Sequence, residues 1–188
     1  MAEPTSSLTA HVRPLEAGAE VVRVAFLAGS PALALADGVV LIGEADAQKR
    51  VVAHPDGAAI LIARAEGSRL VTGGDDGRVV VTASDGSVQQ IADEKGRWID
   101  ALATRGEAIA WAAGRNVSAR DDAGAVKTVT APSTVRGLAF LPKGYRLALA
   151  HYNGVTLWFP NVAGEPAGLD WKGSHLDVTA SLDGRFVV

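Results

Sequence analysis

The sequence contains no cysteine, a single methionine and few aromatic residues, which make up 5% of its 188 positions. The absence of cysteine excludes disulfides, thiolate–zinc centres and cysteine nucleophiles. No apolar run approaches the roughly 20 residues that a membrane-spanning helix needs, so no membrane partner is expected. The 18 basic and 21 acidic side chains give a net charge of −3. This balance lacks the basic excess typical of nucleic-acid binders, so no nucleic-acid partner is expected either.

The first twenty residues have no basic head followed by an apolar core. No signal peptide is therefore expected, and the expected compartment is the cytoplasm. Two prolines and several small polar residues predict a flexible arm over 1–20, with one extended segment near Leu8–Leu15. Apolar residues nevertheless form 48% of the chain, which is enough to offset the entropy of a folded chain.

Glycine is abundant, with 21 residues, and it recurs at regular intervals. Short runs rich in valine, leucine, isoleucine and alanine end at turn steps such as Asp-Gly, Asn-Gly and Gly-Gly. Examples are the segments 21–26, 31–36, 38–43, 68–73, 78–83 and 87–92. Such runs predict many short antiparallel strands joined by hairpins. The repetitive part has no 3.6-residue apolar period over three turns, so the predicted fold class is all-β.

Comparison of the sequence with itself aligns four segments, each built around a tight turn. They read ALALADGVVLI, RLVTGGDDGRVVV, IAWAAGRNVSA and LALAHYNGVTLW. Their turn positions, Gly38, Gly77, Asn116 and Gly154, are separated by 39, 39 and 38 residues. A further turn follows each third strand, at 46–47, 85–86, 122–124 and 161–162. Each repeat is therefore predicted to contain four strands, which is the size of a propeller blade.

The repeats resemble those of the WD40-repeat β-propellers. Segment 54–81 has that family's order of a histidine, an apolar strand, a tight turn, Leu-x-Thr-Gly and Asp-Asp-Gly. Segment 135–158 contains Leu-Ala-Phe-x-Pro-x-Gly and a tryptophan that closes the third strand, and segment 171–188 resembles the opening of another repeat. The first and third repeats match loosely, so the chain is interpreted as a divergent bacterial member of the family.

The resemblance implies an incomplete ring. Four blades are predicted at about 21–56, 57–95, 96–133 and 134–173, and a fifth begins at 174–188. Because WD40 rings usually have about seven blades, the chain is interpreted as the N-terminal part of a longer propeller. Residues 1–20 would then supply the outer strand that closes the last blade. The alternative is self-association, in which two copies cover their open ends.

The resemblance also implies that His54, Thr72 and Asp76 form a structural hydrogen-bond set, with Thr82 where the family places a tryptophan. The same three residues could be interpreted as a hydrolase-like triad. However, the sequence has no nucleophile elbow and no second donor for an oxyanion, which favours the structural role. The other repeats depart from the set: Arg115 and Asn153 replace the aspartate, and Ala131 replaces the histidine.

Metal and phosphate sites are not predicted. The spacings of the four histidines, His11, His54, His151 and His175, match no local metal motif. The glycine-rich segment 73–77 carries two carboxylates and lies between strands, whereas a phosphate loop precedes a helix. No catalytic residue, metal ligand or cofactor is therefore assigned.

Protein partners are the expected ligands. In WD40 propellers the docking face carries the loops between blades and the turns between second and third strands. Hot spots are enriched in tryptophan, tyrosine and arginine. Trp98 aligns with the first residue of an inner strand at that face, although it could instead be packed core. The candidate partner-binding residues are Arg97, Trp98, Arg115, His151 and Tyr152.

The predicted function is that of a non-enzymatic scaffold for protein–protein interaction. A propeller that binds a small molecule or metal, or catalyses a reaction through its channel loops, is the alternative. That alternative predicts carboxylates or histidines converging on the channel, whereas the aligned inner-strand positions here are mostly apolar. A third interpretation is a fragment that has no function without the missing blades. Trp111 and Trp158 are predicted to be buried between blades, and Trp171 fits either environment.

Overall fold

The computed structural model describes residue 12 and residues 14–188, and within them regular structure is almost entirely β-strand. The exception is one 3-10 turn, η2 (Ala45–Ala47). In the described part of the chain, no helix is long and apolar enough to cross a membrane. The strands are β1 (Val21–Leu27), β2 (Ser30–Leu35), β3 (Val39–Ile42), β4 (Lys49–Val52), β5 (Ile60–Glu66), β6 (Arg69–Gly74), β7 (Arg78–Ala83), β8 (Val88–Asp93), β9 (Ala101–Arg105), β10 (Ala108–Ala113), β11 (Asn116–Arg120), β12 (Val126–Thr130), β13 (Gly137–Phe140), β14 (Leu147–Trp158) and β15 (Ala167–Ser174).

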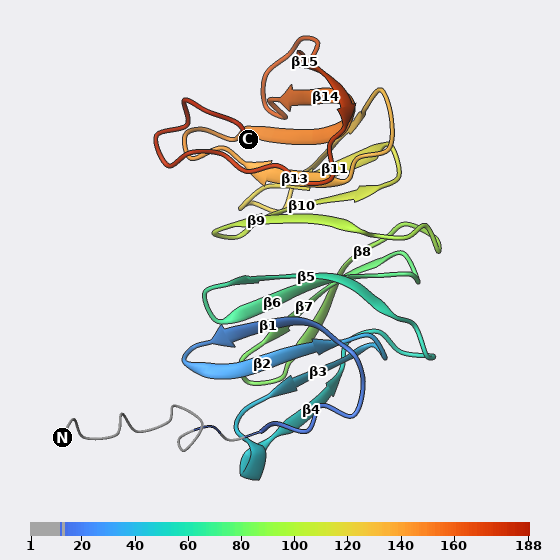
Figure 1. Ribbon diagram of the computed structural model, residues 1–188, viewed down its shortest axis with the longest axis vertical. Coiled ribbons are helices and arrows are strands. Elements are labelled where there is room, and N and C mark those ends of the chain that lie inside the picture. The colour runs from blue at the N-terminus through green and yellow to red at the C-terminus, as the bar shows by residue number, and fades with distance from the viewer. Residues whose placement is uncertain (1–11, 13) are drawn as a thin grey trace, which may run out of the picture.

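Consecutive strands pair antiparallel into separate sheets (Figure 1). The orders are β1-β2-β3-β4, β5-β6-β7-β8 and β9-β10-β11-β12, so each sheet is a meander of four neighbouring strands. Tight turns make this possible. Gly38, between β2 and β3, has a φ of +83°, and a Cβ there would lie 2.3 Å from the carbonyl oxygen of His54. Only glycine fits this turn and its close contact with the following loop.

The fourth sheet has the order β13-β14-β15, but its middle strand folds back on itself. Residues 147–150 of β14 pair with β13, and residues 154–157 pair with β15. In between, Asn153 has a φ of +67°. Nε2 of His151 lies 2.8 Å from Oγ1 of Thr156, a contact that a straight strand rising about 3.3 Å per residue could not make. The fourth sheet is therefore also a four-stranded blade, with the expected turn inside β14.

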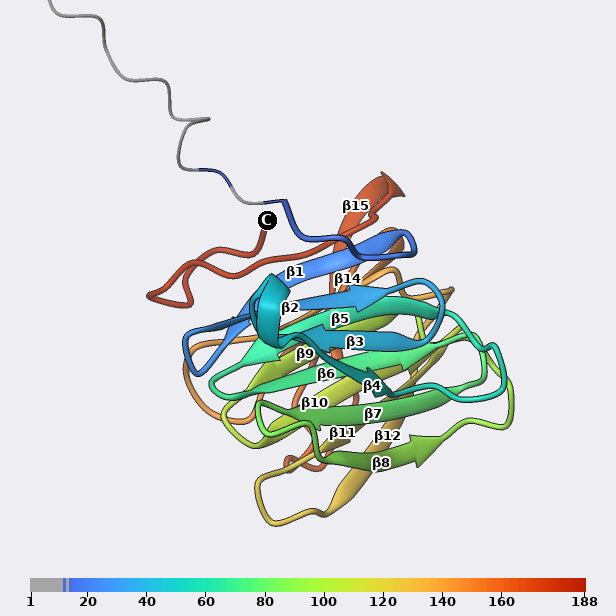
Figure 2. The ribbon, with the colours of Figure 1, turned by 90° about the horizontal axis from the view of Figure 1, so that it is seen from below.

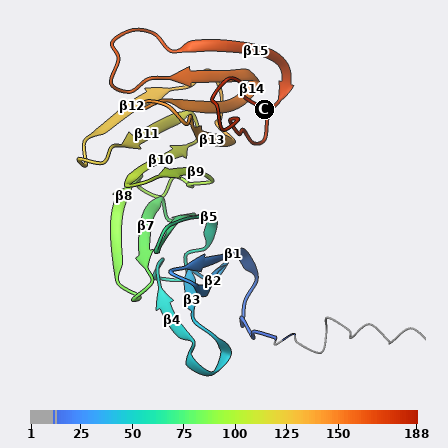
Figure 3. The same cartoon turned by 90° about the vertical axis from the view of Figure 1, so that its left-hand side faces the viewer.

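The four sheets fan out along an arc (Figure 3). β1 and β5 lie on the inner side of this arc, and β8 lies on the outer side. Figure 2 shows the same succession within the first sheet, from β1 to β4. Contacts between β1 and β5, β5 and β9, and β9 and β13 join the successive sheets. The all-β fold with four blades and the start of a fifth, as an incomplete propeller, is confirmed.

Apolar side chains fill each gap between sheets, because most central strands are buried on both faces. Val40 and Leu70 belong to the cluster between the first two sheets, and Ile99 and Trp111 belong to the next. Between the third and fourth sheets, the cluster includes Trp158 with many alanines of β9, β10 and β11. Trp111 and Trp158 are therefore packed in the core, as predicted, at 3% and 7% exposure. Alanine lets neighbouring sheets approach closely.

One basic side chain crosses each of the three gaps and donates to a main-chain carbonyl of the next sheet. Lys49 Nζ donates to Asp85 O at 2.5 Å. Arg69 donates to Gly106 O across the second gap. Arg105 Nη1 donates to Leu141 O and Gly144 O, both at 2.6 Å, across the third. These bonds tie the turns of successive sheets together.

The two ends of the arc differ in how well they are covered. At the first sheet, Leu33, Leu35, Val39 and Leu41 form a cluster against which Leu15 and two alanines pack. At the other end, Val178 packs on the fourth sheet, and residues 179–188 form a short hairpin with an Ala180–Val187 bridge. Large apolar side chains stay exposed there, including Trp171, Leu176, Phe186 and Val188.

Two details of the sequence prediction need correction or qualification. Asn116 is not in a turn: it pairs with Ala113, and Gly114 and Arg115 form the two-residue hairpin instead. Gly114, with a φ of +66°, adopts the left-handed conformation at lower cost than asparagine. The extended segment predicted near Leu8–Leu15 falls largely on residues 1–11 and 13, which lie outside the described residues. The blade limits and the role of residues 1–20 stay predictions.

Candidate protein-interaction surface

His54, Thr72 and Asp76 come together at the junction of the first two sheets. His54 follows β4, Thr72 lies on β6, and Asp76 lies in the turn after β6. His54 Nδ1 is 3.1 and 3.2 Å from the two carboxylate oxygens of Asp76, and His54 Nε2 is 2.9 Å from Oγ1 of Thr72. A carboxylate can only accept, so Nδ1 carries the proton and Nε2 accepts from the threonine hydroxyl.

This hydrogen-bonded set is enclosed rather than open to a substrate. His54 and Thr72 are 1% and 0% exposed. Burial lowers the pKa of His54 below its ordinary value, and the nearby Asp76 carboxylate opposes this effect without reversing it. Asp76 also accepts from the main-chain N–H of Arg78 at 3.0 Å. The set therefore holds the loop after β4 against the turn after β6, which favours the structural interpretation.

Trp98 lies in the loop between β8 and β9, three residues before β9 begins at Ala101. It was predicted to be the first residue of the inner strand, and that placement is wrong. Ile99 is the residue that plugs the core, at 0% exposure, and its N–H donates to Gly74 O at 3.0 Å. Because Ile99 points inward, Trp98 points outward and is 64% exposed. The interpretation of Trp98 as packed core is therefore also wrong.

Trp98 borders an open cleft between two successive loops. The cleft has a volume of about 290 Å³. Ala113 ends β10, Gly114 lies in the turn after it, and Thr134 comes from the loop before β13. Arg97, Trp98 and Asp100 of the preceding loop complete the lining. The cleft therefore crosses from the third blade to the fourth.

Arg97 and Trp111 share Glu94, a residue that the sequence did not single out. Arg97 Nη2 donates to Glu94 Oε2 at 2.7 Å, and the Trp111 indole N–H donates to Glu94 Oε1 at 2.9 Å. Trp111 is buried, so Glu94 anchors the loop to the core. The sequence contained no signal for this contact, because Glu94 lies in the loop after β8 and Trp111 lies on β10 of the next repeat.

Arg115 is exposed at the turn after β10, next to the cleft residue Gly114. Its Nε donates to Ala131 O at 3.0 Å. The alignment of the repeats places Arg115 at the position of Asp76, and Ala131 at the position of His54. Arg115 belongs to the third repeat and Ala131 to the fourth, so this bond joins two successive repeats, whereas the contact between His54 and Asp76 lies within the second.

His151 and Tyr152 have different environments although they are adjacent. Tyr152 is 58% exposed, and its N–H donates to Ser133 Oγ at 3.0 Å. His151 is 5% exposed and is held by Tyr152 O and Thr156 Oγ1. His151 therefore cannot contact a partner, and its inclusion in the exposed patch needs correction. Ser133 precedes the cleft residue Thr134, so this bond holds Tyr152 of β14 against the loop that borders the cleft.

Comparison with solved structures gives the fold a name. The chain matches one in the crystal structure of the mitotic checkpoint complex with a TM-score of 0.66 and 19% sequence identity. It has the fold of a WD40-like β-propeller. The match covers 89% of this propeller chain and 57% of the other, so the chain spans little more than half the length of its structural relative. No protein-family model and no curated protein matches the sequence.

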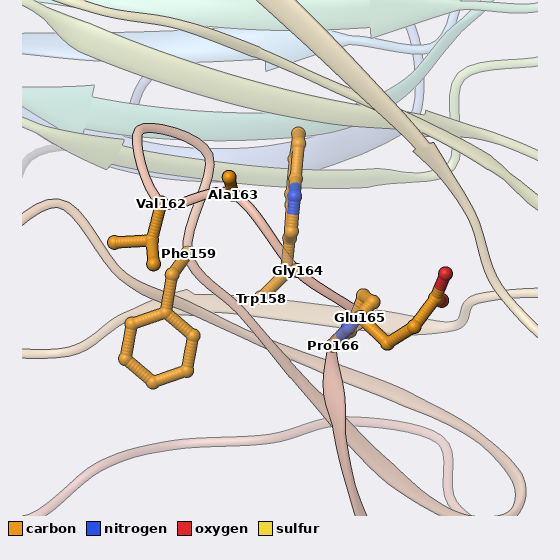
Figure 4. Close-up of a pocket in the computed structure, with 7 residues that line it drawn as sticks. All are labelled: Trp158, Phe159, Val162, Ala163, Gly164, Glu165 and Pro166. Atoms are coloured by element: carbon orange, nitrogen blue, oxygen red, sulfur yellow. The ribbon is translucent and has the colours of Figure 1, made fainter.

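The fold by itself selects no function, since 732 chains of solved structures match this propeller. Of its other cavities, one of about 410 Å³ is lined by Leu169, Trp171, His175 and Val187 near the last hairpin. The pocket in Figure 4 holds only about 40 Å³ and lies between Trp158 and the loop from Val162 to Pro166. A cavity of about 320 Å³ is lined by Arg64, Phe140 and residues 177–179. Among the described residues, no three side chains of histidine, aspartate or glutamate gather as a metal site would require.

Proposed function

We propose that this propeller is a non-enzymatic platform for protein–protein interaction, as a member of the WD40-repeat family. The docking surface consists of Arg97, Trp98, Arg115 and Tyr152, with the cleft of about 290 Å³ between them. The observation that carries the proposal is the exposure of Trp98, 64%, beside that cleft. Exposed tryptophans bordering a cavity are typical of hot spots in protein interfaces.

The loop that carries Trp98 is held firmly, which supports a binding role. Ile99 N donates to Gly74 O at 3.0 Å, and Gly96 N donates to Asp76 O at 3.1 Å. The Glu94 carboxylate then fixes Arg97 at the side of the cleft. A side chain that is already positioned loses less conformational entropy when a partner binds, so more of the contact energy appears as affinity.

The structural relative comes from a crystallised protein complex, which is consistent with protein partners. We propose that the partner is a protein in the cytoplasm. The channel side supports no competing catalytic proposal, because the cavity lined by Arg64 and Phe140 brings only one carboxylate, Asp177, beside an arginine.

The test compares two exposed tryptophans that border different cavities, and it therefore shows which of the two surfaces holds the partner. Trp98 lies on the proposed surface, and Trp171, 74% exposed, lies on β15 outside it. Trp98→Ala and Trp171→Ala are each used to capture partners from a lysate of the source cells, and the melting temperature of each is recorded. We expect Trp98→Ala to lose the captured protein and Trp171→Ala to retain it, with little change in either melting temperature. Equal capture by both variants would contradict the proposal.

A further inference from the structure

The acidic side chains that flank Trp98 in its own segment, residues 93–100, are each paired with a basic side chain. Three carboxylates in this region each contact one basic side chain of the same surface. The pairs are Asp93–Lys95 at 3.3 Å, Glu94–Arg97 at 2.7 Å and Asp100–Arg136 at 2.5 Å. Arg115 is the fourth basic residue, and within the described part of the chain it makes no ion pair. Arg115 is therefore a positively charged side chain beside the cleft that no carboxylate of the described residues contacts.

The geometry of Arg115 prepares its guanidinium for an anion. The bond from its Nε to Ala131 O fixes the side chain through one nitrogen. The two terminal nitrogens make no hydrogen bond with the described residues. A guanidinium held in this way presents a planar pair of donors, which matches the two oxygens of a carboxylate. Arg115 is exposed, so a partner carboxylate can reach it.

The neighbouring cleft suits one large apolar side chain. Ala113 and Gly114 contribute no polar side-chain atoms, and Trp98 contributes an aromatic ring. The volume of about 290 Å³ falls just below the range of about 300–1,000 Å³ for small-molecule pockets. Because Arg97 and Asp100 are already paired with Glu94 and Arg136, the cleft offers an incoming charge little new stabilisation.

We propose that this surface recognises an acidic, extended segment of the partner protein. A large apolar side chain enters the cleft beside Trp98, and a nearby aspartate or glutamate binds Arg115. This proposal rests on the proposed function, and it adds the chemistry of the bound segment. The segment continues over Ser133 and Thr134 toward Tyr152, because Ser133 Oγ joins that loop to the N–H of Tyr152. The carboxylate is taken to be that of an internal residue of the segment, since it binds Arg115 while the apolar side chain occupies the cleft.

The probes are short labelled peptides, and their binding to the full chain is measured by fluorescence anisotropy. The first peptide has one leucine flanked by aspartates, the second has asparagines in place of the aspartates, and the third has alanine in place of the leucine. A fourth has no aspartate and ends at the leucine with a free carboxylate. We expect the chain to bind the first peptide at least about tenfold more tightly than the second, as a charge-assisted hydrogen bond implies. The third peptide should bind more weakly than the first.

Variants of the chain identify the residues that cause the preference for the aspartate peptide. Arg115→Gln should lower the affinity for the aspartate peptide to that for the asparagine peptide, while the asparagine peptide itself is unaffected. Arg120→Gln, on the last residue of β11 away from the cleft, is the matched control and should leave every affinity unchanged. Trp98→Ala should abolish binding of both peptides.

The failures of the two proposals are distinguishable. Suppose the aspartate and asparagine peptides bind equally, and Trp98→Ala binds neither. This result would overturn the preference for an acidic segment but would still support the proposed interaction platform. Tighter binding of the fourth peptide would overturn the assignment to an internal carboxylate. If no peptide binds the wild-type chain, the proposed segment chemistry is wrong. The capture experiment with Trp98→Ala and Trp171→Ala then tests separately whether the chain is a protein-interaction platform.

Discussion

Nε2 of His54 lies 2.9 Å from Oγ1 of Thr72, and both side chains are almost completely buried. A neutral histidine fits this arrangement, because His54 Nδ1–H donates to the Asp76 carboxylate and the threonine hydroxyl donates to Nε2. Protonation of Nε2 would bring a charge into this buried site, with Thr72 Oγ1 turned to donate to Val80 O at 3.3 Å instead. The consequence is a stability that depends on pH.

We predict that the free energy of unfolding falls as the pH drops below about 6.5. Burial lowers the pKa of His54 in the folded protein below 6.5. The unfolded chain therefore takes up a proton in a range where the folded protein does not, and acid favours unfolding. The slope is at most about 1.4 kcal/mol per pH unit, and it levels off below the folded pKa. Urea unfolding between about pH 5 and 7.5 measures this slope, and His54→Gln should remove it. A slope that persists in that variant would contradict the assignment.

The hydrogen-bond set of His54, Thr72 and Asp76 leaves no room for a side chain at Gly74. A Cβ at this position would lie 2.5 Å from both Asp76 Oδ1 and His54 Nδ1. Gly74→Ala should therefore destabilise the protein by about 1–3 kcal/mol, as forced overpacking does. Gly168→Ala is the control, since its Cβ would meet only Asp170 Oδ1 at 3.8 Å. That variant should stay within about 0.5 kcal/mol of the wild type. Similar chemical denaturation curves for the two variants would contradict the prediction.

Arg105 should stabilise the junction of the third and fourth blades. Its guanidinium lies 5.1 Å from the centre of the Phe140 ring and donates to Leu141 O and Gly144 O. Arg105→Met keeps an apolar chain over Phe140 but removes both hydrogen bonds, and it should cost about 1–3 kcal/mol. Hydrogen exchange should accelerate first in β13 and β14, because the loop that accepts these bonds from Arg105 joins the two strands. Unchanged exchange in these strands would show that Arg105 contributes nothing to the junction.

Leu15 should protect the end of the first blade. It packs against the cluster that contains Leu33, Leu35 and Leu41. Leu15→Asp brings a charge to this apolar face and should destabilise the chain by about 1–3 kcal/mol. Leu182, 97% exposed, provides the matched control, and Leu182→Asp should change the free energy of unfolding by less than about 0.5 kcal/mol. An equal effect of the two substitutions in thermal melts would argue that residues 14–19 do not cover the blade.

The repeat spacing predicted much of the fold, because strand length and turn chemistry are local properties. The run 78–83 coincides with β7, and Gly38 and Gly77 adopt positive φ in the predicted turns. Asn116 was misplaced because two turn-forming residues, Gly114 and Asn116, lie two positions apart, and glycine took the turn. In β14 the repeat spacing correctly located the turn near Gly154.

The candidate surface was less predictable. Of two residues adjacent in the sequence, one fills the core and the other is exposed, and the sequence does not show which. Ile99 rather than Trp98 filled the gap between the second and third blades, and His151 rather than Tyr152 turned inward. The contacts of Glu94 with Arg97 and Trp111, and of Arg136 with Asp100, join residues from different repeats. No local pattern in the sequence marks such contacts.

Site-specific photo-crosslinking in the source cells tests whether the face that carries Trp98 binds a protein partner. A photoreactive side chain at Thr134, inside the cleft beside Trp98, is compared with one at the exposed Lys127 of the outer strand β12. We expect a discrete protein adduct from position 134, none from position 127, and loss of the adduct when Trp98→Ala is added. No adduct from position 134, or the same adduct from both positions, would contradict the claim that this face of the propeller binds a protein partner.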